Sequence, residues 1–261
     1  MIELRRPAGQ FARVGHRGAS ALAPENTLRA LELAVELGCD MLEFDVLDLI
    51  DGTLVLAHSN ALREVSHGVA RGTVRSRSLD ALRRVAPDLP TLDEALAFCR
   101  ERLPGIGLQV DLKRRGPEGG VVDALRRHDV LDRSWVSGFD VASLVVSPSW
   151  SPACRAPTPC LVTVSGSPSG VRSPRSCGAP SPQSALPCRG VFQCSSPGRV
   201  PPRRLCTTRS HRRLRSPVRT SWMRAVYVWT VDDSTLAERL VRDGADGIIT
   251  NDPRIFATLK A

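Results

Sequence analysis

The stretch Met41-Leu-Glu-Phe-Asp-Val46 alternates apolar side chains with two acidic ones, Glu43 and Asp45. Side chains two residues apart on a β-strand point to the same face, so this pattern predicts a strand with both carboxylates on one side. A helix is predicted just before it, over Thr27–Leu37, because apolar residues recur there at helical spacing and Gly38 suits a helix C-terminus. The chain thus passes from helix to strand within a few residues, as α/β proteins do.

The same alternation of strand and helix continues on both sides of this stretch. Strands are predicted over 11–14, 53–58, 106–113 and 135–137, and helices over 91–102 and 121–128, the first of them with a capping box. The alternation returns with strands at 225–229 and 247–250, a helix at 234–242, and a helix start at 252–253. Repeated βα units of about 25–40 residues favour a parallel sheet covered by helices, either a barrel or a doubly wound sheet. The 261 residues suffice for one such domain.

Between residues 145 and 223 this alternation disappears, and 161–164 is the one convincing strand-like run. The segment holds 13 of the 20 prolines and six of the eight cysteines, and residues 141–231 include 13 arginines but no lysine, aspartate or glutamate. It therefore accounts for the net charge of +9, because the rest of the chain has 23 basic and 27 acidic residues.

Two explanations fit this aberrant segment. It is either a disordered basic linker or a stretch read in a shifted frame between two compensating frame changes. The abrupt loss and return of acidic residues favours the second explanation, which an unambiguous in-frame nucleotide sequence would rule out. We therefore expect a single domain over 1–261 whose fifth and sixth βα units are absent or badly formed.

Composition excludes several other classes of protein. No apolar run approaches the roughly 18 residues of a membrane-spanning helix, and the first residues carry charges instead of a signal sequence, so we expect a cytoplasmic protein with no membrane span. The cysteine spacings contain no C-x₂-C pair, which argues against a zinc site. The arginine-rich segment lacks a recognisable RNA-binding pattern, so no specific nucleic-acid partner is expected. The sequence does not define the oligomeric state.

Several short segments, in order along the chain, carry the chemistry. They are Gly15-His-Arg-Gly18 followed by Pro24-Glu-Asn-Thr27, Leu42-Glu-Phe-Asp-Val46, His58 with Leu62-Arg63 and Gly68 downstream, Val110-Asp-Leu-Lys113, Val228-Trp-Thr-Val-Asp232 and Asp246-Gly-Ile-Ile-Thr-Asn-Asp-Pro253. Together they resemble the glycerophosphodiester phosphodiesterase family over about residues 11–144 and 224–256. The resemblance implies a (βα)₈ TIM barrel.

The resemblance also implies an activity: metal-dependent hydrolysis of glycerophosphodiesters, which are small-molecule substrates, to sn-glycerol 3-phosphate and an alcohol. The residues that match the family's site are the acid/base pair His16 and His58, the substrate-binding residues Arg17, Lys113 and Trp229, and the metal ligands Glu43, Asp45 and Asp111. Which histidine is the acid stays open. The family commonly has Glu where this chain has Asp111, and Asp where it has Ser59.

The residue types themselves agree with one divalent cation. Three carboxylates gathered at the ends of barrel strands repel one another unless a cation lies between them. Oxygen-only ligands suit a hard ion, either Mg²⁺ or Ca²⁺. The competing hypothesis is a catalytically inactive or misfolded product of a frameshifted gene, because losing two barrel units removes more buried apolar surface than a net stability of about 5–15 kcal/mol tolerates.

Overall fold

One eight-stranded sheet runs through the part of the chain that the structure, a computed structural model, describes: residues 4, 6–7, 9–138, 162–165 and 225–259. The strand order is β5-β4-β2-β1-β8-β7-β6, and β3 pairs with β2 off this path. The strands are β1 (Ala12–His16), β2 (Met41–Asp48), β3 (Leu54–Leu56), β4 (Gly107–Leu112), β5 (Ser134–Gly138), β6 (Val162–Ser165), β7 (Val226–Trp229) and β8 (Gly247–Thr250).

Every strand pair except β2–β3 is parallel. The first strand, β1, pairs with both β2 and β8, so the two ends of the chain meet within the sheet, as they do in a barrel. The strand-like run predicted at 161–164 is β6, which pairs with β7. The rest of the fifth and sixth units, in 139–161 and 166–224, lies outside the described residues, and the single domain over 1–261 therefore stays a prediction.

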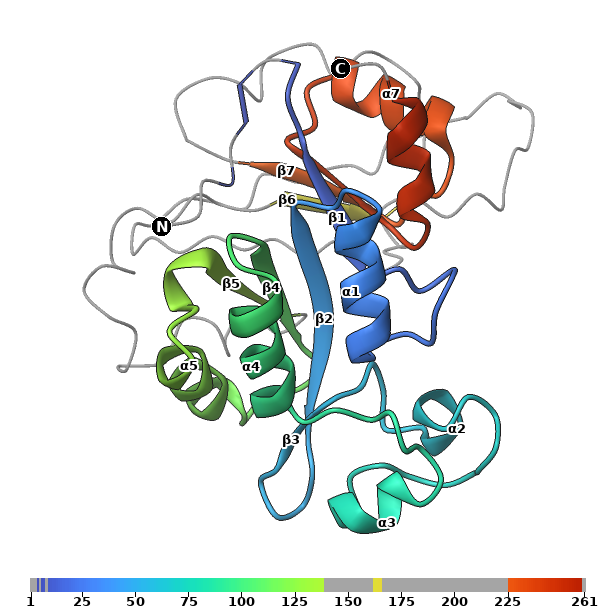
Figure 1. Cartoon of the computed structure of the whole chain (residues 1–261), viewed down its shortest axis with the longest axis vertical. Helices are drawn as coiled ribbons and strands as arrows, with labels where there is room; N and C mark the ends of the chain where they lie inside the picture. Colours follow the sequence, from blue (N-terminus) through green and yellow to red (C-terminus); the bar gives the residue numbers. More distant parts are fainter. Residues whose placement is uncertain (1–3, 5, 8, 139–161, 166–224, 260–261) are drawn as a thin grey trace, which may run out of the picture.

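Helices follow the strands, and the four longest of the described helices are those that the sequence predicts. They are α1 (Leu28–Glu36), α2 (Leu62–Val65), α3 (Leu79–Arg83), α4 (Leu92–Arg102), α5 (Glu118–Arg127) and α7 (Ser234–Arg242), with 3₁₀ turns at Leu131–Arg133 and Pro253–Thr258. Figure 1 shows α1 beside β2, α4 next to α5, and the short α2 and α3 set apart near the β2–β3 end of the sheet.

The helix ends have identifiable physical causes. The Thr27 and Asp233 side chains accept hydrogen bonds from the first turns of α1 and α7, and the capping box predicted at Thr91 is confirmed. One predicted boundary is wrong: α5 begins at Glu118 instead of residue 121, because two glycines in its first turn give no apolar periodicity.

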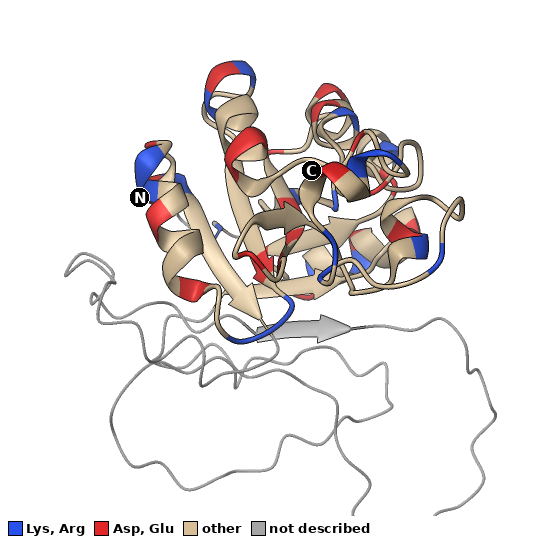
Figure 2. Cartoon of the chain, turned by 90° about the horizontal axis from the view of Figure 1, so that it is seen from below, with Lys and Arg blue, Asp and Glu red and all other residues tan. Residues whose placement is uncertain are grey.

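Strand β2, which carries Glu43 and Asp45, lies at the centre of the core. All of β2 except its last residue is buried, and Leu42, Phe44 and Val46 pack in the largest apolar cluster. The intervening Glu43 is only 4% exposed, and Asp45 is fully buried. Figure 2 shows acidic segments at the centre of the view as well as on the surrounding helices, which carry both signs of charge.

Within the described residues, no helix has the length and apolar character needed to cross a lipid bilayer. The expected cytoplasmic location stays a prediction.

Candidate active site

Strand register brings the predicted acidic residues together. His16 of β1 is aligned with Glu43 of β2, and two residues further along β2 Asp45 is aligned with Asp111 of β4. Aligned residues of neighbouring strands point to the same face, so these four side chains share one side of the sheet near the strand C-termini. One carboxylate oxygen from each of the three acidic residues lies within 4.8 Å of the others.

This spacing fits a single divalent ion. Calcium binds oxygens at about 2.3–2.6 Å, so two ligands on opposite sides of the ion are about 4.6–5.2 Å apart, and Mg²⁺ needs a slightly tighter set. The three residues predicted as metal ligands, Glu43, Asp45 and Asp111, therefore have suitable donor chemistry and suitable separation. Their role as ligands stays a prediction.

Two cations already lie against these carboxylates. The Lys113 ammonium is 2.6 Å from Asp45 Oδ1 and 2.6 Å from Asp111 Oδ2. The Arg17 guanidinium is 3.0 Å from Asp45 Oδ2 through Nε, and its Nη1 donates to Glu25 at 2.8 Å. Burial acts to raise the pKa of Asp45, but Lys113 and Arg17 outweigh it and hold that pKa below its usual value. Asp45 is therefore ionised.

The pKa of Glu43 shifts in the opposite direction to that of Asp45. Burial raises its pKa well above the usual range, and the nearby Asp45 and Asp111 carboxylates raise it further. The opposing effects are the Lys113 charge and a hydrogen bond of 2.9 Å from the Arg17 backbone N–H to Glu43 Oε2. A carboxyl in this position gains from an additional cation, because the cation offsets both the burial and the crowding of like charges.

His16 lies at the edge of the carboxylate cluster. Its Nε2 is 3.9 Å from Glu43 Oε2, and its Nδ1 is 2.6 Å from Asn251 Oδ1. Burial lowers the pKa of His16, and the neighbouring Arg17 charge lowers it further, so the ring is neutral near pH 7. The Trp229 ring, predicted to line the substrate site, lies beside it with the ring centroids 6.5 Å apart.

His58 makes fewer contacts with the other predicted site residues than His16 does. It follows β3, and the N–H of the preceding Ala57 donates to the carbonyl of Asp45, which brings this segment to the same end of the sheet. The side chain is 36% exposed and its ionic partner is Glu64, with 3.5 Å between Nδ1 and Oε2. Among the described residues, no hydrogen bond or ion pair joins His58 to His16 or to the three carboxylates.

The sequence motifs include Asn26 but do not reveal its contact with the site, and they do not include Ser137. Asn26 Nδ2 donates to Asp45 Oδ2 at 2.9 Å, and the Asp45 N–H donates back to Asn26 Oδ1 at 3.1 Å. Ser137 Oγ donates to Asp111 Oδ1 at 2.6 Å and accepts from Gln109 Nε2. The signal for Ser137 is its alignment with Asp111 between β4 and β5, which only the strand register reveals.

The turn that follows His16 needs glycine at Gly18. Its φ of +80° is left-handed, and a Cβ there would overlap the backbone carbonyl of Ala30 in α1. We expect Gly18→Ala to destabilise the fold by more than the roughly 1–3 kcal/mol that a left-handed conformation alone costs, measured as a lower melting temperature. Gly52→Ala is the matched control, because Gly52 has φ of +86° but no neighbour within 4 Å. Equal losses in the two variants would refute the proposed clash.

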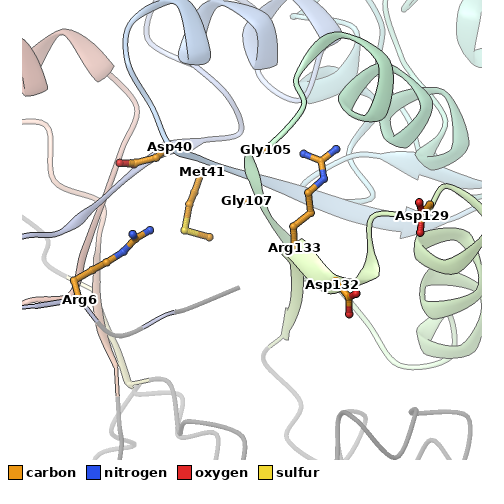
Figure 3. A pocket seen from close by; sticks show the side chains of 8 residues that line it. All are labelled: Arg6, Asp40, Met41, Gly105, Gly107, Asp129, Asp132 and Arg133. Atoms are coloured by element: carbon orange, nitrogen blue, oxygen red, sulfur yellow. The ribbon is translucent and has the colours of Figure 1, made fainter. Parts of the chain in front are cut away.

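A separate cavity lies at the other end of the strands. It has a volume of about 440 Å³ and is lined by Arg6, Asp40, Met41, Gly105, Gly107, Asp129, Asp132 and Arg133 (Figure 3). The Arg133 guanidinium hydrogen-bonds the backbone carbonyls of Cys99, Leu103 and Ile106, where α4 ends. Met41 and Gly107 begin β2 and β4, so this cavity lies at the N-terminal ends of the strands, opposite the carboxylate cluster. In TIM barrels, residues at this face contribute to stability and those at the opposite face to catalysis.

Comparisons with known proteins point to one family. Residues 16–133 match the Glycerophosphoryl diester phosphodiesterase family. A glycerophosphodiester phosphodiesterase of Caldanaerobacter subterraneus is 23% identical over 261 residues, which cover 94% of this chain and 96% of that protein. The uncharacterized protein YqiK of Bacillus subtilis is 30% identical over 151 residues, or 52% of this chain. The chain spans 61% of the length of YqiK and 47% of another Bacillus subtilis relative.

Solved structures agree on the fold. A phosphodiesterase of Oleispira antarctica, determined in complex with the product sn-glycerol-3-phosphate, aligns with a TM-score of 0.64 and 19% identity over 96% of each chain. The glycerophosphodiester phosphodiesterase of Thermotoga maritima also gives 0.64, at 18% identity. The TIM-barrel fold class predicted from the sequence is therefore confirmed. Residues 16–133, from the end of β1 to the turn before β5, match the glycerophosphoryl diester phosphodiesterase family, a family of phosphoric diester hydrolases, and the resemblance expected from the sequence is therefore confirmed.

Proposed function

We propose that this chain hydrolyses glycerophosphodiesters to sn-glycerol 3-phosphate and a free alcohol, using one divalent cation, Mg²⁺ or Ca²⁺, and a pair of histidines. The observation that carries the proposal is the convergence of three carboxylates within 4.8 Å of one another, with the imidazole of His16 beside them. Support also comes from the family match and from the product that the Oleispira antarctica relative binds.

The cation would be held by Glu43, Asp45 and Asp111. When bound, it would polarise a phosphoryl oxygen and neutralise charge that develops during attack. Arg17 and Lys113 supply further positive charge in the same buried region, with only 16% and 11% of their side chains exposed. Cations in a site with little water attract an anionic phosphodiester more strongly than surface cations do.

Proton transfer would be divided between two imidazoles. Hydrolysis forms a bond from the water oxygen to phosphorus, breaks the bond from phosphorus to the alcohol oxygen, and moves one proton from water and another to the alcohol. His16 is neutral and adjacent to the carboxylates, so it can accept a proton. His58 is at the same end of the sheet, more exposed, and completes the pair. Trp229 would pack against the glycerol moiety beside His16.

The first test is the activity of the full chain. Incubation with glycerophosphocholine should release sn-glycerol 3-phosphate when Mg²⁺ or Ca²⁺ is added, fall to background after chelation with EDTA, and recover when the ion is restored, because the carboxylate cluster needs the cation to bind and polarise the phosphate. Coupled enzymatic detection of glycerol 3-phosphate measures the rate.

The other outcomes separate the alternatives. Release that EDTA does not affect would rule out the metal, and no release from a chain that melts cooperatively would rule out the hydrolysis. A circular-dichroism signal without a cooperative melt would instead favour the inactive product of a frameshifted gene. The ordered cluster of carboxylates and cations favours the active enzyme over that alternative.

A further inference from the structure

Asn251 joins the C-terminal part of the chain to the imidazole of His16. It immediately follows β8, and its Oδ1 is 2.6 Å from His16 Nδ1. The same oxygen accepts a hydrogen bond of 2.9 Å from Ser20 Oγ, which lies in the segment between β1 and α1. The imidazole of His16 and the hydroxyl of Ser20 therefore both lie within hydrogen-bond distance of one amide oxygen.

Asp232 fixes the orientation of this amide. Its Oδ2 accepts from Asn251 Nδ2 at 2.8 Å, and its Oδ1 accepts from the Asn251 backbone N–H at 2.8 Å and from Thr250 Oγ1 at 2.8 Å. An ionised carboxylate only accepts hydrogen bonds, so the NH₂ group of Asn251 has to face Asp232. The amide oxygen is then the group that faces His16.

An acceptor at Nδ1 determines which ring nitrogen carries the proton. In a neutral imidazole one nitrogen donates and the other accepts, and a partner on one side sets the choice. We infer that Asn251, clamped by Asp232, is a positioning residue that keeps His16 in the Nδ1–H tautomer and directs its unprotonated Nε2 toward the carboxylate cluster. This inference rests on the proposed hydrolysis for its role in the rate, and it assigns His16 as the general base.

The proton movements follow from this tautomer. The lone pair of His16 Nε2 takes the proton of the attacking water as the new oxygen–phosphorus bond forms. The Nδ1–H bond to Asn251 persists throughout, so the imidazolium that results is already hydrogen-bonded on its far side. The alcohol oxygen leaves phosphorus with a proton from a second acid, for which His58 is the proposed group.

The tautomer can be read directly by NMR of the full chain with ¹⁵N-labelled histidine. We expect the His16 signals, identified by their loss in His16→Gln, to show a protonated Nδ1 and an unprotonated Nε2. Asn251→Leu should abolish this pattern and lower kcat for glycerophosphocholine on the order of 10²-fold with little change in KM. His128, whose Nε2 is 2.8 Å from Asp93 Oδ1, is the internal control and should be unchanged in all variants.

Exchanging the residues at positions 251 and 232 tests whether Asn251 positions the His16 ring through its hydrogen bond or only packs against it. Asp232→Asn alone removes the clamp, and Asn251→Asp alone places two carboxylates together, so both single variants should lose the tautomer and the rate. The double variant Asn251→Asp with Asp232→Asn restores one acceptor facing His16 and one amide behind it. It should recover the Nδ1–H pattern and most of kcat.

Three results would overturn the inference: an Nε2–H tautomer in the wild-type chain, an unchanged tautomer in Asn251→Leu, or a double variant no better than the single ones. A wild-type chain that shows the Nδ1–H pattern but no hydrolysis would refute the proposed function while leaving the role of Asn251 in the tautomer intact.

Discussion

Asp45→Asn is expected to lower kcat/KM for glycerophosphodiester hydrolysis by about 10³-fold or more. Asp45 is the fully buried member of the carboxylate cluster, and it also contacts both Lys113 and Arg17. Losing its charge removes a ligand from the proposed cation and an ionic partner from Lys113 and Arg17, the side chains proposed to bind the phosphate. A metal ion in such a site contributes several kcal/mol, and about 4 kcal/mol corresponds to the stated loss. Steady-state kinetics and calorimetric titration with Ca²⁺ measure the two effects.

Asp48→Asn provides the matched control for this variant. Asp48 is the last residue of the same strand, and its carboxylate pairs with Arg75 and Arg114 away from the cluster. It should keep cation binding and turnover near the wild-type values, with a stability change of about 1 kcal/mol or less. If Asp45→Asn does not fold, Glu43→Gln tests the same ligand set. Metal-stimulated turnover that survives either change would exclude the cluster as the cation site.

His16→Gln should lower kcat by about 10²–10⁴-fold, the usual contribution of a general acid or base. The imidazole is the only part of the side chain that can accept a proton near neutral pH, and glutamine keeps a similar length and a polar end. Cation binding should persist, because the three carboxylates are unchanged. This combination of lost turnover and retained binding, measured by kinetics and calorimetry on one sample, separates His16 from the ligands.

His128→Gln serves as the comparison for His16. This histidine follows the C-terminal end of α5, where its Nε2 pairs with Asp93 of α4 and not with the carboxylate cluster, and its replacement should have no effect on kcat. The melting temperature of His16→Gln should match that of the wild-type chain. An active His16→Gln enzyme would remove His16 from the mechanism.

The acidic strand and its place in the fold could be predicted because both depend on local patterns. Alternation over Met41–Val46 fixes which side chains share a face, and the same reasoning applies around Asp111. The helices α2 and α3 could not be predicted in this way, since they have only 4 and 5 residues and show no helical period.

The supporting contacts of the site could not be predicted because they depend on which strands become neighbours. Asn251 and His16 are 235 residues apart, and they meet only because β8 pairs with β1. Ser137 and Asp111 are 26 residues apart and meet through the register of β4 and β5. Parallel pairing leaves no mark in the local sequence. The motifs therefore include His16 and Asn251 but do not show that these two residues hydrogen-bond each other, and Ser137 lies outside all the motifs.

The contact between Asn251 and His16 has a consequence for the order in which the site is completed during protein synthesis. A ribosome that has translated as far as residue 138 has already delivered the three carboxylates and both imidazoles of the proposed mechanism. Asn251, Asp232 and Trp229 have not yet been made, so the nascent chain lacks the C-terminal side chains that contact His16 or hold Asn251 in place. Under the proposed mechanism, the chain would therefore gain catalytic competence late, when β8 is translated and docks against β1.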